Sequence, residues 1–181
     1  MEADPRAQVE APIRGALTGV MAHGIGLVVV VAAIAFVPHV LHADLAIRYG
    51  SVAAAVVALV GYSVAVRVLA LLHGRPSPAL RDLAWSRASE LDAEDAMLSL
   101  LVAGWVPVAL ALALALLLWP HLTSPDPGVS AAVVVFGVPP VVLAWVLAAD
   151  AWGDACRDSL ARAELESQLR FRSYWATLGR H

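Results

Sequence analysis

Four long apolar stretches dominate the pattern of hydrophobic and polar positions along this chain. They cover residues 15–37, 49–72, 97–119 and 129–151, and each contains few ionisable side chains. A helix needs roughly 20 residues to cross a hydrocarbon core of about 30 Å, at about 1.5 Å per residue. The pattern therefore predicts an all-α, polytopic membrane protein with four transmembrane helices.

The polar segment between the second and third stretches has a helical pattern of its own. Ser77 followed by Pro78 is a favourable N-cap and first-turn pair. The residues that follow form an apolar side and an opposing charged side. The apolar side comprises Leu80, Leu83, Ala84 and Trp85, and the charged side comprises Arg81, Asp82 and Arg87. This pattern predicts a short amphipathic helix lying on the inner leaflet.

Beyond the fourth stretch, apolar residues recur at helical spacing with charged residues between them. Arg162 and Glu166, and Glu166 and Arg170, are spaced as i,i+4 ion pairs. We expect an amphipathic cytoplasmic helix that continues the fourth transmembrane helix. The predicted organisation is a cytoplasmic segment at 1–14, a four-helix bundle at 15–151 and a cytoplasmic tail at 152–181.

The distribution of arginines predicts the orientation in the membrane. The loop at 38–48 has one arginine and the loop at 120–128 has none, whereas the amino-terminal segment, the second loop and the tail hold most of them. Arginine is enriched on the cytoplasmic side of membrane proteins. Both termini and the second loop are therefore predicted inside the cell. Aromatic residues near the span ends, such as Tyr49, Trp119 and Trp152, agree with these boundaries.

Composition supports the membrane assignment and excludes several function classes. Hydrophobic residues make up 60% and charged residues 15%, against roughly 25% charged in soluble domains. The net charge of −3 gives no field that favours nucleic acid. All twelve basic residues are arginine, which excludes a Schiff-base lysine and a Walker-type phosphate loop. Cys156 is the only cysteine, so the chain forms no internal disulfide.

The bias towards Ala, Val, Leu, Arg, Gly and Pro is typical of a GC-rich bacterial gene, which indicates a bacterial plasma membrane.

Three ionisable residues within or beside the spans are candidate polar sites: His23, Arg67 and Asp150. A charge at bilayer depth costs roughly 2.5–3.5 kcal/mol, so it normally has a partner or faces the bundle interior. Arg67 either extends to the inner headgroups or pairs with Asp150. His23 is interpreted as a neutral side chain hydrogen-bonded across a tight helix contact, and the alternatives are a proton relay or a cofactor ligand.

Small residues on the first span predict close helix packing. Gly15 and Gly19 form one small-xxx-small pair, and Ala22 and Gly26 form another. We expect the first and second helices to pack through these positions.

The histidines suggest two possible metal sites. His39, His42 and His121 lie in the two outer loops near Asp44 and Asp126, and imidazoles with carboxylates suit zinc or copper. The alternative is that they are ordinary hydrated loop residues. A haem held by His23 and His73 fits less well, because those residues are predicted at different depths.

Prolines interrupt the last two spans near their centres. Pro107 lies in the third span, and Pro139 and Pro140 lie in the fourth. Each proline removes a backbone donor and kinks its helix, which frees the carbonyls of Ala103, Val135 and Phe136. Transporters bind ions with such carbonyls, but ordinary kinked helices contain them too.

The favoured function is therefore a non-enzymatic accessory or scaffolding subunit of a larger membrane complex. No serine or cysteine has an obvious neighbouring base, and no cofactor motif is present. The expected partners are the lipid bilayer and either another membrane protein or further copies of this chain. The alternatives are a small transporter or channel subunit, and a metal- or haem-binding membrane protein.

Overall fold

A computed structural model describes residues 5–41, 44–90 and 93–178, and these residues form helices joined by short connections. In chain order the elements are α1 (Pro5–Val40), α2 (Leu45–His73), α3 (Pro78–Glu90), α4 (Ala93–Leu122), α5 (Pro127–Ala132), the π-helical turn η1 (Val133–Gly137) and α6 (Val138–Leu178).

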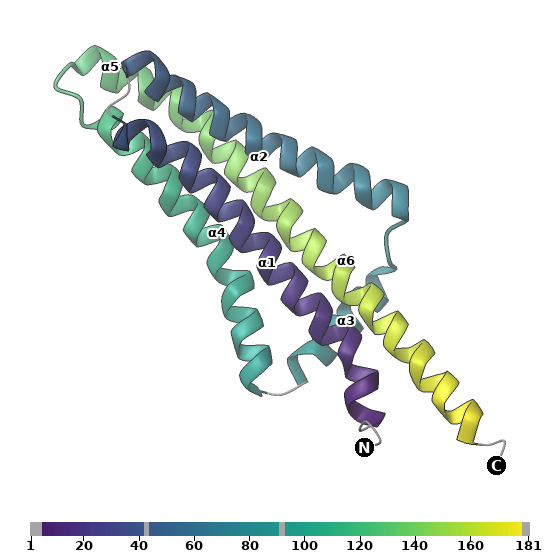
Figure 1. Cartoon of the computed structure of the whole chain (residues 1–181). Helices are drawn as coiled ribbons and strands as arrows, with labels where there is room; N and C mark the ends of the chain where they lie inside the picture. Colours follow the sequence, from purple (N-terminus) through teal and green to yellow (C-terminus); the bar gives the residue numbers. More distant parts are fainter. Residues whose placement is uncertain (1–4, 42–43, 91–92, 179–181) are drawn as a thin grey trace.

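The long helices α1, α2, α4 and α6 run side by side as a bundle (Figure 1). Four segments are long and apolar enough to cross a membrane: Glu10–Pro38, Ile47–His73, Trp105–Leu122 and Pro127–Ser173. The prediction of four spanning helices in an all-α chain is confirmed at this level. Both termini and the α2–α3 connection lie at one end of the bundle, hereafter the terminal end (Figure 1). Which side of a membrane this end faces stays a prediction.

The bundle core is apolar and takes side chains from every long helix. Val31 of α1, Leu59 of α2, Leu110 of α4 and Trp152 of α6 are almost fully buried in one cluster. In a membrane such packing holds helices together through van der Waals contact, because lipid tails are as apolar as the side chains themselves.

A second hydrophobic cluster lies at the terminal end and involves α1, α3 and α6. Its buried members are Ile13, Ala84, Ala88, Leu160, Ala161 and Ala163. Helix α1 begins at Pro5, ten residues before the apolar run that predicted it. The predicted separate segment at 1–14 is therefore helical from Pro5 onward, and Ile13 is buried under the neighbouring helices.

Helix α3 begins where its cap predicted, but it presents a different face to its neighbours. The amide of Leu80 donates to the Ser77 hydroxyl over 3.3 Å. Ala84 and Ala88 are buried, whereas Leu83 and Trp85 are exposed. Arg81 is largely buried and points to α6, where it pairs with Asp158. Arg81 therefore faces α6 and does not share an exposed charged side with Asp82 and Arg87, while the position of α3 on an inner leaflet stays a prediction.

In the fourth spanning segment, a π-helical turn precedes the proline pair. The amide of Val138 donates to the carbonyl of Val133, five residues earlier, and Pro139 and Pro140 follow directly. The wider turn accommodates residues that lack a backbone donor. The helix then continues unbroken to Leu178, as expected for a tail that extends the fourth span.

Candidate functional site

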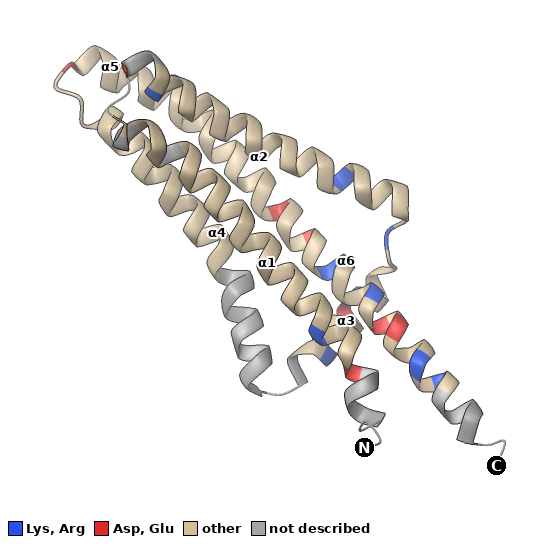
Figure 2. Cartoon of the chain, in the orientation of Figure 1, with Lys and Arg blue, Asp and Glu red and all other residues tan. Residues whose placement is uncertain are grey.

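Most charged residues of the described part of the chain lie towards the terminal end (Figure 2). Arg81 of α3 lies 2.6 Å from Asp158 and 3.8 Å from Asp154, both on α6. Arg75, in the α2–α3 connection, lies 3.2 Å from Asp154. These contacts tie the connection and α3 to α6.

A second ion pair fixes the far half of α3. Arg87 lies 2.6 Å from Glu164, whose side chain is 0% exposed. The Gln168 amide donates to the same carboxylate oxygen over 2.9 Å, while the other oxygen, Oε2, is buried without a hydrogen-bond partner. Glu164 therefore depends on Arg87 for its neutralisation. Of the two i,i+4 pairs predicted in the tail, Arg170 pairs with Glu166, whereas Arg162 donates to the carbonyl of Gly74.

Arg67 and Asp150 form an ion pair between α2 and α6. The guanidinium nitrogen lies 3.1 Å from the carboxylate, and the side chains are 45% and 65% exposed. The sequence left two interpretations of Arg67, extension to the headgroups and pairing with Asp150, and the structure contains the pair.

His23 lies where α1 meets α2 and α6. Its ring makes edge-on contacts with Tyr62 at 5.5 Å and Trp152 at 5.8 Å between ring centroids. The adjacent Gly24 is buried, and a Cβ added there would lie 2.7 Å from Trp152 and from Val106. The tight helix contact is therefore at Gly24.

The small residues predicted to pack α1 against α2 do not do so. Gly15, Gly19, Ala22 and Gly26 are exposed, and no atom lies within 4 Å of a Cβ added at any of the three glycines. The interpretation is wrong within this chain because Gly24 and Val31 turn the opposite side of α1 inward. The exposed small residues leave a surface on α1 that another helix can approach.

A cavity of about 260 Å³, hereafter the α2–α6 cleft, opens between those helices near the terminal end. Its lining combines apolar residues of α2 with polar residues of α6. The residues are His23, Val66, Leu69, Ala70, His73, Ala155, Asp158, Ser159 and Arg162. His23 and His73 thus border one cavity, although sequence reasoning placed them at different depths.

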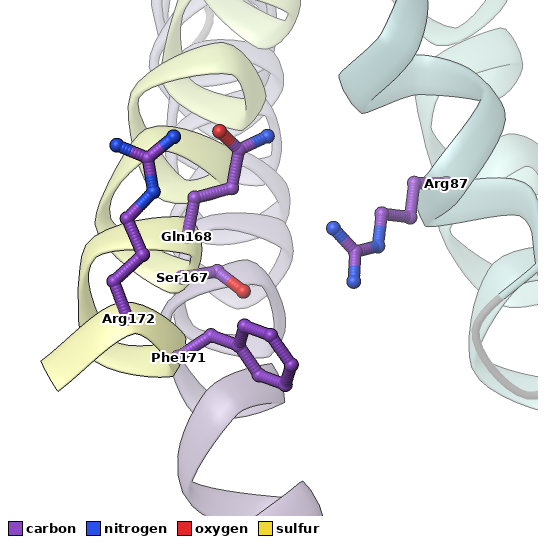
Figure 3. A pocket seen from close by; sticks show the side chains of 5 residues that line it. All are labelled: Arg87, Ser167, Gln168, Phe171 and Arg172. Carbon is purple, nitrogen blue, oxygen red and sulfur yellow. The ribbon is translucent and has the colours of Figure 1, made fainter. Parts of the chain in front are cut away.

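A second cavity of about 260 Å³ lies further along α6 (Figure 3). Arg87 of α3 forms one side, and Ser167, Gln168, Phe171 and Arg172 of α6 form the other. In Figure 3 the Arg172 guanidinium points away from Arg87. Because Arg87 is also bound to Glu164, the two guanidinium groups do not converge on a shared ligand.

The outer histidines are only partly covered by the structure. The side chains of His39 and His42 lie outside the described residues. His121 is 4% exposed and stacks on Tyr49, with ring centroids 4.5 Å apart. Among the described residues, no group of three His, Cys, Asp or Glu side chains is placed to hold a metal ion. The metal site at His39, His42 and His121 stays a prediction.

The backbone beside Pro107 has an unexpected partner. The indole nitrogen of Trp145 donates to the Pro107 carbonyl over 2.8 Å, which joins α6 to α4 in the apolar core. The buried serines of α2 are bonded within their own helix, Ser51 to the Arg48 carbonyl and Ser63 to the Leu59 carbonyl. Sequence reasoning missed Trp145, although a tryptophan near mid-span is a signal that a buried acceptor is close.

Comparison with other proteins leaves the chain without an assigned relative. No protein-family model, curated protein or solved structure matches it.

Proposed function

We propose that this protein is a non-enzymatic accessory or scaffolding subunit that holds a rigid helical platform beside the membrane for a partner protein. The platform comprises α3, residues 5–17 of α1 and residues 152–173 of α6. The observation that carries the proposal is the packing of these three parts around the second hydrophobic cluster. A bundle that only anchors the chain needs no such extension.

The ion pairs within the platform support a binding role. Arg81 with Asp158 and Arg87 with Glu164 fix α3 against α6 at two separate points. A surface held rigidly in this way loses little conformational entropy when a partner binds.

The platform also exposes large apolar side chains. Leu165 and Leu169 of α6 are 49% and 57% exposed and lie one helical turn apart. Asp150 lies at the predicted end of the fourth apolar stretch, and Leu165 lies about 22 Å further along the helix, at about 1.5 Å per residue. Exposed apolar residues at this spacing are typical anchors for a partner helix. The exposed small residues of α1, Gly15, Gly19, Ala22 and Gly26, provide a second place for close helix approach.

Transport is the second candidate, favoured by the π-helical turn η1 before Pro139 and Pro140. Such turns recur at functional sites. If the protein transports a solute, reconstituted vesicles will show a flux that is lost in the Pro139→Ala, Pro140→Ala double variant. Vesicles without a flux would count against transport. We rank it second because the described core cluster is built of apolar residues.

The test of the subunit proposal is purification of the full chain from its host membranes in mild detergent, with co-purifying proteins identified by mass spectrometry. The Leu165→Ser, Leu169→Ser variant removes the apolar anchors, and the Gly15→Leu, Gly19→Leu variant blocks helix approach. We expect one or both to lose a stoichiometric partner.

A matched control is available on α2. Gly50 and Gly61 also have no atom within 4 Å of an added Cβ, so Gly50→Leu, Gly61→Leu makes the same chemical change on another helix. The partner should be retained in this control. A wild-type protein that purifies alone, or partners that persist in both test variants, would overturn the proposal.

A further inference from the structure

The α2–α6 cleft has one positive charge that its neighbours do not neutralise. The carboxylate of Asp158 lies 2.6 Å from Arg81, so this acid is already compensated. Among the described contacts, Arg162 donates to the neutral carbonyl of Gly74 over 3.2 Å. The cleft is therefore a place where a negative charge is stabilised.

Hydrogen-bond donors are available beside this charge. The Arg162 guanidinium has five N–H groups, of which the Gly74 carbonyl occupies one. Ser159, on the same side of α6, adds a hydroxyl to the lining. The Nδ1 atom of His73 lies 2.9 Å from the Leu69 carbonyl oxygen and so carries the hydrogen. Its other ring nitrogen is then able to accept a hydrogen bond from a hydroxyl group of a ligand.

The opposite wall of the cleft is apolar. It consists of Val66, Leu69 and Ala70 of α2. Leu69 is itself half-exposed, and the neighbouring Leu72 is more exposed still. A ligand that satisfies both walls has an anionic head and an apolar body. A free anion would satisfy only the α6 side.

The volume limits how much of that ligand enters. At about 260 Å³, the cleft is below the roughly 300–1,000 Å³ of pockets that enclose a drug-sized ligand. It has no room for a haem macrocycle or a whole lipid. It is suited to a single headgroup whose chains stay outside, along the exposed apolar surface of α2.

We propose that the α2–α6 cleft binds the phosphate group of an anionic phospholipid. Arg162 and Ser159 donate to the phosphate oxygens, and the acyl chains lie along Leu69 and Leu72. Basic pockets between membrane helices are a known place for anionic headgroups. The α6 residues of the cleft belong to the proposed platform, but lipid binding here does not require a partner protein.

The test is native mass spectrometry of the full chain in detergent, titrated with phosphatidylglycerol or with phosphatidylcholine, which has the same phosphate but no net charge. We expect phosphatidylglycerol to bind roughly tenfold more tightly. Arg162→Gln keeps a donor for the Gly74 carbonyl but removes the charge. It should weaken phosphatidylglycerol binding by roughly tenfold, as expected for the loss of charged hydrogen bonds.

Two further variants make the result specific. Arg157→Gln removes an exposed arginine of α6 that does not line the cleft, and it should leave binding unchanged. Ala155→Leu fills the cleft without altering its charge or the Arg162–Gly74 bond, and it should weaken binding while the thermal midpoint is retained.

Equal binding of both lipids, equal losses in Arg157→Gln and Arg162→Gln, or unchanged binding in Ala155→Leu would overturn the proposal. Displacement of the lipid by inorganic phosphate at equal affinity would also overturn it, in favour of a free-anion site.

Discussion

At the scale of single residues, Gly24 is the position where α1 tolerates least change. An added Cβ would lie 2.7 Å from Trp152 and Val106, both buried side chains of neighbouring helices. We expect Gly24→Ala to destabilise the protein by about 1–3 kcal/mol, the usual cost of overpacking. Gly26→Ala meets no atom within 4 Å and should gain up to about 1 kcal/mol from helix propensity. Thermal unfolding in detergent measures both, and equal midpoints would contradict the assignment.

The spacing of glycines alone does not distinguish these two positions. The first span contains several small residues, and the sequence pattern favoured Gly15, Gly19, Ala22 and Gly26 as the packing set. Which of them faces inward depends on the rotation of α1 about its axis. That rotation is set by Trp152, which is distant in the sequence. Contacts across the fold, and not local pattern, therefore decide the role of each glycine.

At the scale of elements, the attachment of α3 to α6 depends on the pair formed by Arg87 and Glu164. Arg87→Gln leaves the carboxylate, which is 0% exposed, without its cation. A broken buried pair costs about 3–5 kcal/mol, but Arg87 is 46% exposed, so solvent screening reduces the expected loss to about 1–3 kcal/mol.

The double variant Arg87→Gln, Glu164→Gln tests the cause of that loss. It removes the uncompensated charge, so it should be more stable than Arg87→Gln alone. Hydrogen exchange of α3 amides, read by mass spectrometry, provides the measurement. If the α3 amides exchange equally fast in both variants, the destabilisation by Arg87→Gln does not come from an uncompensated charge on Glu164.

The sequence predicted the helices better than their ends or their contacts. Apolar runs reveal where a chain can cross lipid, so all four spans were found. Apolar runs do not mark where a helix ends outside the lipid, because packing against other helices can stabilise further turns. Helix α1 begins at Pro5, and Ile13, which precedes the apolar run, is buried together with residues of α3 and α6. The inward turn of Arg81 was likewise missed, since it depends on Asp158, far along the chain.

At the scale of the whole molecule, most of the charged residues in the described part of the chain lie towards the terminal end (Figure 2). The charged residues that line the two cavities belong to α3 and to the part of α6 near this end. Along the remaining length, exposed valines and leucines are common. This asymmetry gives the molecule two chemically different ends. Because arginine is retained on the cytoplasmic side of membranes, the terminal end is expected to face the cytoplasm.

Cysteine accessibility tests this orientation directly, because the native Cys156 is buried and free and should react little in the folded protein. Leu41 is exposed in the connection after α1, and Ala79 is exposed on α3. A membrane-impermeant maleimide applied to intact spheroplasts should label Leu41→Cys at once and Ala79→Cys only after the membrane is opened. The unmodified chain controls for Cys156. Labelling of Ala79→Cys from outside, with Leu41→Cys protected, would reverse the orientation and place the platform on the outer face, where its partner would then have to be sought.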